Sequence, residues 1–422
     1  MAGAAEAGAW QEWRRHWSVI IPCFLGIMLV TAHGYSMGVM ILPLEEEFGW
    51  LRSQISAGLM IVALMALLAG PLVGGLVDRF GPRRIGLAGV LLYCSSLAGL
   101  SLATGNVLTW WGLWFVVALA GVSVMPVVWI AVLNAYFFKS RGLAMAIALS
   151  GTGMGAAVWP MLTNALVEGF GWRMAYVGLA GIGAVICFPA ALILFREADG
   201  ARRKSTVTTP KGGVSLAGDA PEARSQMRNP RFVKMAAAAV IFALANGTLT
   251  QNMVPVLVND GLTPAKAAAT AGLLGLGSIT GRLVGGLLLD RYNANIVAAV
   301  SVILPIVTVA LLLAMEGDQL WAAIACLVMG FAVGAELDCA AYLVGRHLGT
   351  LNFGALFGAI NGMLIFGAAA APVISNLVYD LVGSYDPVLV VLVPAFVVTA
   401  ILFLALGEYR HLDPESGKPL QG

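Results

Sequence analysis

The feature that most constrains this chain is a series of apolar stretches, each about as long as the 20 or so residues that a helix needs to cross a bilayer. Charged residues make up only 11% of the 422 residues and apolar types 59%, with a mean hydropathy of +0.88. A soluble domain carries about 25% charged residues. We therefore expect an all-α membrane protein whose main surroundings are the lipid bilayer.

Twelve stretches of this kind divide the chain into two halves. Residues 196–231 separate the halves, because they are rich in Arg, Thr, Gly and Pro and have no apolar period. We predict an N-terminal six-helix half over residues 1–195, a cytoplasmic linker over 196–231, and a C-terminal six-helix half with a short tail over 232–422. The predicted spans are 18–43, 53–77, 84–104, 108–137, 142–167, 173–195, 232–258, 265–289, 295–315, 319–343, 353–379 and 386–407.

The positions of the basic residues predict the orientation of these helices. Of 24 Lys and Arg residues, only Arg52, Arg173 and Lys266 fall in the loops on one side, and one more lies within a span. Basic residues gather on the cytoplasmic side, so we expect both termini in the cytoplasm and a plasma membrane location, such as a bacterial inner membrane. The first apolar stretch is too long for a cleavable signal peptide and is interpreted as the first span.

A short motif recurs in both halves with the same orientation. Gly74-x-x-x-Asp78-Arg79 lies at the end of the second span, and Gly286-x-x-x-Asp290-Arg291 lies at the end of the eighth, 212 residues later. Parallel repeats of this kind are typical of transporters. An aspartate at a helix end can pair with nearby arginines and with a helix terminus, which predicts a cytoplasmic gate; alternatively, the basic residues only anchor the loops. The candidate gate residues are Asp78, Arg79, Arg83, Asp290, Arg291, Asp338 and Arg346.

With these motifs the chain resembles the major facilitator superfamily over nearly its whole length. The loop from Gly74 through Asp78-Arg79-Phe80-Gly81-Pro82-Arg83-Arg84 is similar to that superfamily's signature. Asn134-Ala135-Tyr136-Phe137 and Gly281-Arg282-Leu283 resemble the monocarboxylate and oxalate/formate transporters, and residues 334–346 resemble bacterial carriers of small organic acids. The resemblance implies a major facilitator fold and a secondary active transporter that works by alternating access. We expect it to function as a monomer.

The chain also departs from these families. Ser278 stands where monocarboxylate transporters of the mammalian type place an aspartate, and His33 lies in the region of their helix-1 lysine. Residues 353–379 contain no basic residue, whereas oxalate carriers have a lysine there. One buried positive charge suits one carboxylate, so we expect a monocarboxylate as the substrate.

Arg282 is the basic residue within a span. It lies nine residues from Arg291, about 13 Å at 1.5 Å per residue. A charge at this depth normally faces a cavity or a partner, and a guanidinium can bind a carboxylate with two parallel hydrogen bonds. We therefore predict that Arg282 binds the substrate; a structural pair with an acid on the tenth span is the alternative.

Other polar residues within the spans are weaker candidates. Glu336 is the better placed of the two acids on the tenth span, since Asp338 shares a face with Tyr342 and Arg346. A carboxyl group buried in an apolar environment can carry a proton, and His33 is a second candidate for proton coupling; both can instead be structural. The further candidates for substrate binding are Asn134, Tyr136, Tyr35 and Gln251.

Enzymatic and ATP-driven functions have no support in the sequence. No phosphate-binding Gly-x4-Gly-Lys-Ser/Thr motif is present, the four histidines are scattered, and no metal-ligand spacing occurs. We expect no cofactor, no metal, no nucleic-acid partner and a proton gradient as the energy source. An anion exchanger, an exporter of amphipathic compounds, and a sensor that binds ligand without transport remain as alternatives.

Overall fold

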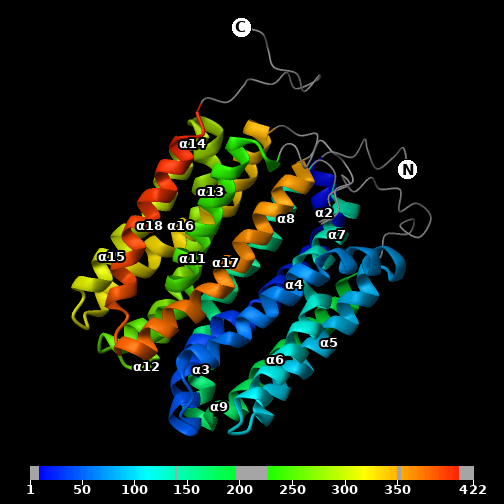
Figure 1. Ribbon diagram of the computed structural model, residues 1–422. Coiled ribbons are helices and arrows are strands. Elements are labelled where there is room, and N and C mark those ends of the chain that lie inside the picture. Colours follow the sequence, from blue (N-terminus) through cyan, green and yellow to red (C-terminus); the bar gives the residue numbers. More distant parts are fainter. Residues whose placement is uncertain (1–8, 138–139, 196–226, 349–352, 408–422) are drawn as a thin grey trace. The chain divides into compact units, whose positions relative to one another are not determined.

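The computed structural model describes residues 9–137, 140–195, 227–348 and 353–407, and the regular elements in these ranges are helices (Figure 1). Eleven helical stretches there are long and apolar enough to cross a membrane. One of them, Leu143–Leu194, breaks at Gly171, where φ is 78° and ψ is 165°. Glycine adopts this backbone conformation without steric cost, so this stretch holds two of the twelve predicted spans. Most of the predicted linker lies outside the described residues.

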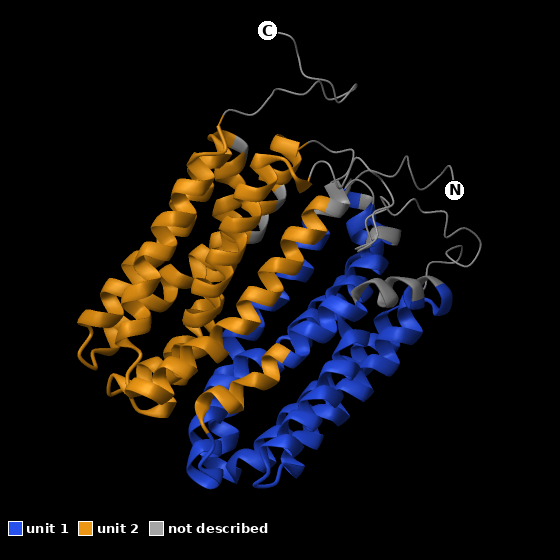
Figure 2. Cartoon of the chain, viewed as in Figure 1, with its two compact units in different colours: residues 1–50, 61–208 blue, residues 51–60, 209–422 orange. Residues whose placement is uncertain are grey.

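The chain forms two compact units, which Figure 2 colours separately. Unit 1 comprises residues 1–50 and 61–208, and unit 2 comprises residues 51–60 and 209–422. The sequence placed residues 51–60 with the first half, whereas their contacts place them in unit 2. The helices before the linker are α2 (Ala9–Val30), α3 (Ala32–Phe48), α4 (Arg52–Phe80), α5 (Pro82–Gly99), α6 (Val107–Gly121), α7 (Pro126–Tyr136), α8 (Arg141–Leu149) and α9 (Gly151–Leu194). Those after it are α11 (Pro230–Asn259), α12 (Pro264–Ala271), α13 (Leu273–Arg291), α14 (Ala294–Ile303), α15 (Pro305–Ala314), α16 (Gln319–Leu348), α17 (Phe353–Val382) and α18 (Asp386–Leu404).

Several spans consist of two helices because the backbone bends within them. Pro126 begins α7 and Pro305 begins α15, and a proline lacks the N–H that would continue the preceding helix. Helices α12 and α13 meet at Gly272. The spans are therefore about as long as predicted, but several of them consist of two consecutive helical segments.

Helices α13 and α16 touch along their backbones. A Cβ atom on Gly281 would collide with the backbone of Phe331, and one on Gly334 would collide with the carbonyl oxygen of Ser278. Small residues allow membrane helices to approach this closely. A similar close approach occurs in unit 1, where a Cβ atom added to Gly151 would collide with the carbonyl oxygen of Phe24.

A buried polar network holds the start of α4 within unit 2. The carboxylate of Asp380 on α17 accepts hydrogen bonds from the backbone N–H groups of Arg52 and Ser53, both at 3.0 Å. An anion at a helix N-terminus satisfies otherwise unpaired N–H groups and the helix dipole. The Arg52 guanidinium lies 3.8 Å from the centroid of the Tyr379 ring and donates to the hydroxyl of Tyr385.

The network continues through buried side-chain amides. The Tyr385 hydroxyl donates to Oδ1 of Asn376, at 2.8 Å. Nδ2 of Asn376 donates to Oγ of Ser56 on α4 and to Oδ1 of Asn252 on α11. Because buried polar groups are costly unless they are hydrogen-bonded, this chain of bonds explains why residues 51–60 group with unit 2.

We expect Asp380→Asn to lower the stability of the protein by about 1 kcal/mol, the usual value of a helix N-cap. An asparagine offers one acceptor oxygen in place of two, so one of the two N–H groups loses its partner. Thermal unfolding of the purified protein in detergent measures the effect. Asp386→Asn is the matched control, because Asp386 is exposed at the start of α18; an equal loss in both variants would contradict the capping role.

Candidate functional site

Arg282 lies on α13 in unit 2, half-buried among the helices. Its Nη1 atom is buried and has no hydrogen-bond partner among the described residues. A buried charged donor without a partner costs free energy, and such an atom is suited to a ligand that supplies an acceptor. Glu336 is hydrogen-bonded to Asn246, and the side chain of Asp338, the other acid on the tenth span, lies outside the described set. A structural pair with an acid on that span therefore stays an untested alternative.

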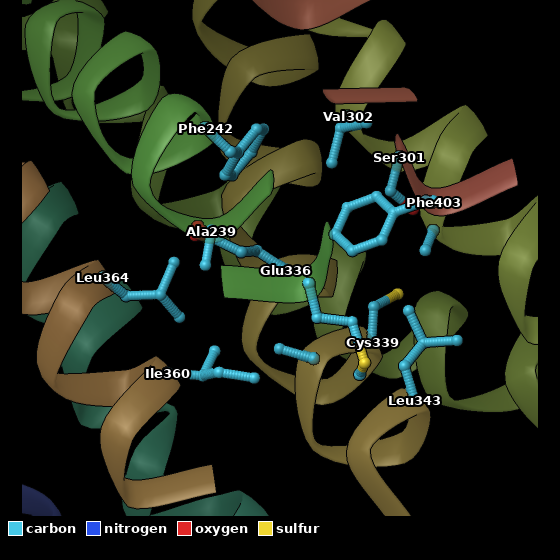
Figure 3. Close-up of a pocket in the computed structure, with 13 residues that line it drawn as sticks. Ala239, Phe242, Ser301, Val302, Glu336, Cys339, Leu343, Ile360, Leu364 and Phe403 are labelled. Carbon is cyan, nitrogen blue, oxygen red and sulfur yellow. The ribbon is translucent and has the colours of Figure 1, made fainter. Parts of the chain in front are cut away.

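Glu336 lies on α16 and bonds with α11. Its Oε2 atom accepts a hydrogen bond of 2.8 Å from Nδ2 of Asn246. Figure 3 shows Glu336 at a small apolar cavity between the helices of unit 2. The cavity has room for about one water molecule, which is too small for an organic acid. Its lining includes Phe242, Ser301, Cys339, Ile360, Leu364 and Phe403.

Polar atoms on α11 fall into two groups. Oδ1 of Asn246 and Oε1 of Gln251 are buried and have no hydrogen-bond partner among the described residues. Asn252, in contrast, donates to Oγ of Ser375 and accepts from Asn376. Most buried polar side-chain atoms are paired in proteins. The unpaired atoms therefore indicate where a ligand or water binds, and Gln251 keeps its place as a substrate-binding candidate.

The candidates in unit 1 have mostly aromatic surroundings. Nδ1 of His33 lies 2.8 Å from the hydroxyl of Tyr93, and the His33 ring packs against Trp114. These contacts favour the structural alternative for His33. The Tyr136 ring lies 4.9 Å from that of His16. Tyr35 is half-buried on α3, and the side chain of Asn134 is outside the described set.

The gate candidates are partly described. Nη2 of Arg346 donates to the hydroxyl of Tyr342 at 2.8 Å, one helical turn away as the sequence spacing predicts. Nη2 of Arg83 donates to the carbonyl oxygen of Leu192 in unit 1. Arg79 lies over the Phe80 ring, and Arg291 is exposed. The side chains of Asp78, Asp290 and Asp338 lie outside the described set, so their predicted pairing remains a prediction.

His347 lies near the end of α16, beyond the predicted span. Its Nε2 atom is 2.9 Å from Oδ1 of Asn295, whose Nδ2 donates to the carbonyl oxygen of Gly407. Burial, with a further effect of the Arg231 charge, lowers the pKa of His347 to about 4. The imidazole is therefore neutral near pH 7, and its surroundings are those of a structural hydrogen-bonding residue.

Sequence reasoning missed Asn246 and the network around Arg52. Asn246 interrupts an apolar span, and an intramembrane polar residue is a recognisable signal. From the sequence, Arg52 is predicted to lie in a loop and only indicates the orientation of the helices. In the structure it is buried, with 8% of its surface exposed. Its role depends on Asp380, which lies 328 residues away in the sequence, and nothing local in the sequence indicates that pairing.

The helical fold and the unpaired polar atoms at its membrane-buried helices are typical of membrane transport proteins. The family model of the Major Facilitator Superfamily matches residues 23–364. The chain belongs to this superfamily. The predicted all-α fold of about twelve membrane helices is confirmed, as is the sequence resemblance.

Several relatives match over most of their length, and two of them illustrate the range. The gallate transporter of Pseudomonas putida is 26% identical, over 93% of this chain and 92% of that protein. Monocarboxylate transporter 12 of Rattus norvegicus is 22% identical, over 92% of this chain and 84% of that protein. The crystal structure of the nucleoside transporter NupG matches with a TM-score of 0.73 and 15% identity, over 92% of this chain and 98% of that one; this likeness concerns the fold alone.

Proposed function

We propose that this protein carries a small organic anion, a monocarboxylate, together with a proton, by alternating access. The observation that carries the proposal is the buried Nη1 atom of Arg282, which has no partner among the described residues. A carboxylate supplies two acceptor oxygens in the geometry that a guanidinium binds. The relatives support this class of substrate, since gallate is a carboxylate and the second relative is named for monocarboxylates.

Glu336 is the proposed proton carrier. It is half-buried beside an apolar cavity, and the group seen to bond with it is the neutral amide of Asn246. Ionising a carboxyl group without a cationic partner in such a place is costly. One proton carried with one monocarboxylate makes the transported charge zero, so a pH gradient drives uptake while a membrane potential does not.

Uptake into proteoliposomes tests the proposal. The purified protein is supplied with radiolabelled gallate and, in parallel, with other small acids, under an imposed pH gradient or an imposed potassium diffusion potential. We expect accumulation of a monocarboxylate under the pH gradient alone. Accumulation that ignores the pH gradient would favour the exchanger, efflux of amphipathic compounds would favour the exporter, and binding without flux would favour the sensor.

We expect Glu336→Gln to abolish accumulation driven by the pH gradient while exchange of labelled for unlabelled substrate continues. Glutamine keeps an acceptor for Asn246 but cannot carry the proton. Initial rates of both processes in proteoliposomes separate these effects. Glu46→Gln is the control, because Glu46 is exposed on α3; accumulation at the wild-type level in Glu336→Gln would remove Glu336 from the mechanism.

A further inference from the structure

Asn246 has an amide group with one end bonded and the other unbonded. Nδ2 donates to Glu336 at 2.8 Å, whereas Oδ1 is buried without a hydrogen-bond partner among the described residues. The residue is only 8% exposed. A buried acceptor left unpaired costs roughly 1–3 kcal/mol, so this arrangement requires an explanation beyond helix packing.

The bond between Asn246 and Glu336 depends on the protonation of Glu336. An ionised carboxylate only accepts hydrogen bonds, and the amide must turn Nδ2 towards it, as the structure shows. A protonated carboxyl group can donate, and Oδ1 of the amide can then accept from it. The χ2 torsion of asparagine is soft, so the amide can rotate and exchange its two ends.

This rotation changes which atom lies at the far end of the amide, the end directed away from Glu336. With Glu336 ionised, the far end is the acceptor Oδ1, which disfavours a nearby carboxylate. With Glu336 protonated, the far end is the donor Nδ2, which favours one. We propose that Asn246 is a positioning residue that transmits the protonation state of Glu336 to the transported carboxylate. The inference rests on the proposed proton coupling at Glu336, and it predicts that the proton binds before the anion.

Among the described residues, the side chain bonded to Glu336 is Asn246 and not a charged group. Asn246 is therefore the residue through which the protonation of Glu336 can act. Cys339 is the titratable side chain that lines the same cavity as Glu336, and a thiol is neutral near pH 7. Helices α14 and α15, which pack on α16, contain no titratable residue. The titratable residues with described side chains on the other helices that pack against α16 are Arg231, Lys234, Lys266, Arg282, Arg291, Tyr379 and Asp380. Of these, Arg282 and Arg291 lie on α13, the helix in backbone contact with α16, and no bond described in the structure joins either of them to Glu336.

The affinity of the full-length protein for radiolabelled gallate, measured across pH 5–8 in detergent, tests the inference. In the wild type we expect affinity to rise about tenfold for each unit of falling pH above the titration of Glu336. In Asn246→Leu, which removes both ends of the amide at similar volume, the affinity should change less than twofold over the same range. Thr248→Val is the matched control, since Thr248 is buried on the same helix and, within the described part of the chain, its hydroxyl donates to its own backbone turn; it should keep the wild-type pH profile.

The outcomes separate this inference from the proposed function. If Glu336→Gln keeps a pH-dependent affinity, proton coupling at Glu336 fails, and the role of Asn246 fails with it. If Glu336→Gln loses the pH dependence but Asn246→Leu retains it, the inference about Asn246 alone is wrong.

A second measurement needs no substrate. Infrared difference spectra between acid and neutral pH show the C=O stretch of the protonated Glu336, identified by its loss in Glu336→Gln. In Asn246→Leu this band should move to higher frequency, because the hydrogen bond from the carboxyl group to Oδ1 is lost. An unchanged band in Asn246→Leu overturns the inference even where gallate binding is too weak to measure.

Discussion

Arg282→Lys is expected to weaken substrate binding by about ten- to a hundredfold, the equivalent of roughly 1.5–3 kcal/mol for a hydrogen bond to a charged group. Lysine keeps the positive charge but is a point charge without the planar fork of the guanidinium. A carboxylate would therefore retain the attraction and lose one of its two parallel hydrogen bonds. The dissociation constant of the transported acid, and its uptake rate at limiting concentration, are the measurements.

The control for this experiment is an arginine that contacts no substrate in the proposal. Arg14→Lys is suitable, because Arg14 is exposed on α2 in unit 1. It should bind and transport at wild-type levels. Wild-type affinity in Arg282→Lys at equal expression would show that the carboxylate does not bind this guanidinium, whereas loss of binding in both variants would indicate a nonspecific effect of charge or expression.

Gly281→Ala is expected to destabilise the protein by several kcal/mol, at or beyond the upper end of the usual 1–3 kcal/mol for overpacking. The added Cβ would collide with backbone atoms of Phe331, which cannot rotate away as a side chain could. Helices α13 and α16 would have to separate along their whole contact. Thermal unfolding in detergent can be followed with a thiol-reactive dye, because Cys326 on α16 is fully buried and reacts only after unfolding.

A second glycine on the same helix provides the control. A Cβ added at Gly286 meets nothing within 4 Å. Gly286→Ala should therefore leave the unfolding temperature unchanged or raise it slightly, since alanine is favoured over glycine in a helix by roughly 1 kcal/mol. Equal destabilisation of the two variants would show that helix propensity, and not backbone contact, determines the effect.

The sequence was sufficient to predict the fold because the bilayer restricts the possible structures. Each span must satisfy its backbone groups internally, so apolar stretches of the right length can only be helices. The repeated Gly-x-x-x-Asp-Arg motif then indicated two halves. What the sequence did not predict was the interruption of the first span at Thr31, between α2 and α3, which depends on the local backbone conformation.

The site was predicted less completely. Arg282 and Glu336 stand out because charges within spans are rare, and the structure places both within unit 2. The hydrogen-bond partner of Glu336 could not be predicted, because Asn246 on α11 lies 90 residues away in the sequence and no local pattern fixes which sides of α11 and α16 face each other. The same limit applies to Arg52. The sequence shows its position in a loop, but it does not show the contacts that Arg52 makes with distant residues.

The backbone contact between α13 and α16 has a consequence for experiments on movement. No layer of flexible side chains separates these helices where Gly281 and Gly334 meet their neighbours, so nothing between them can deform. Spin labels placed on the lipid-facing sides of the two helices should report one distance under all conditions. Such a pair would serve as an internal standard of length, against which labels elsewhere in the molecule show which segments move when substrate and protons bind.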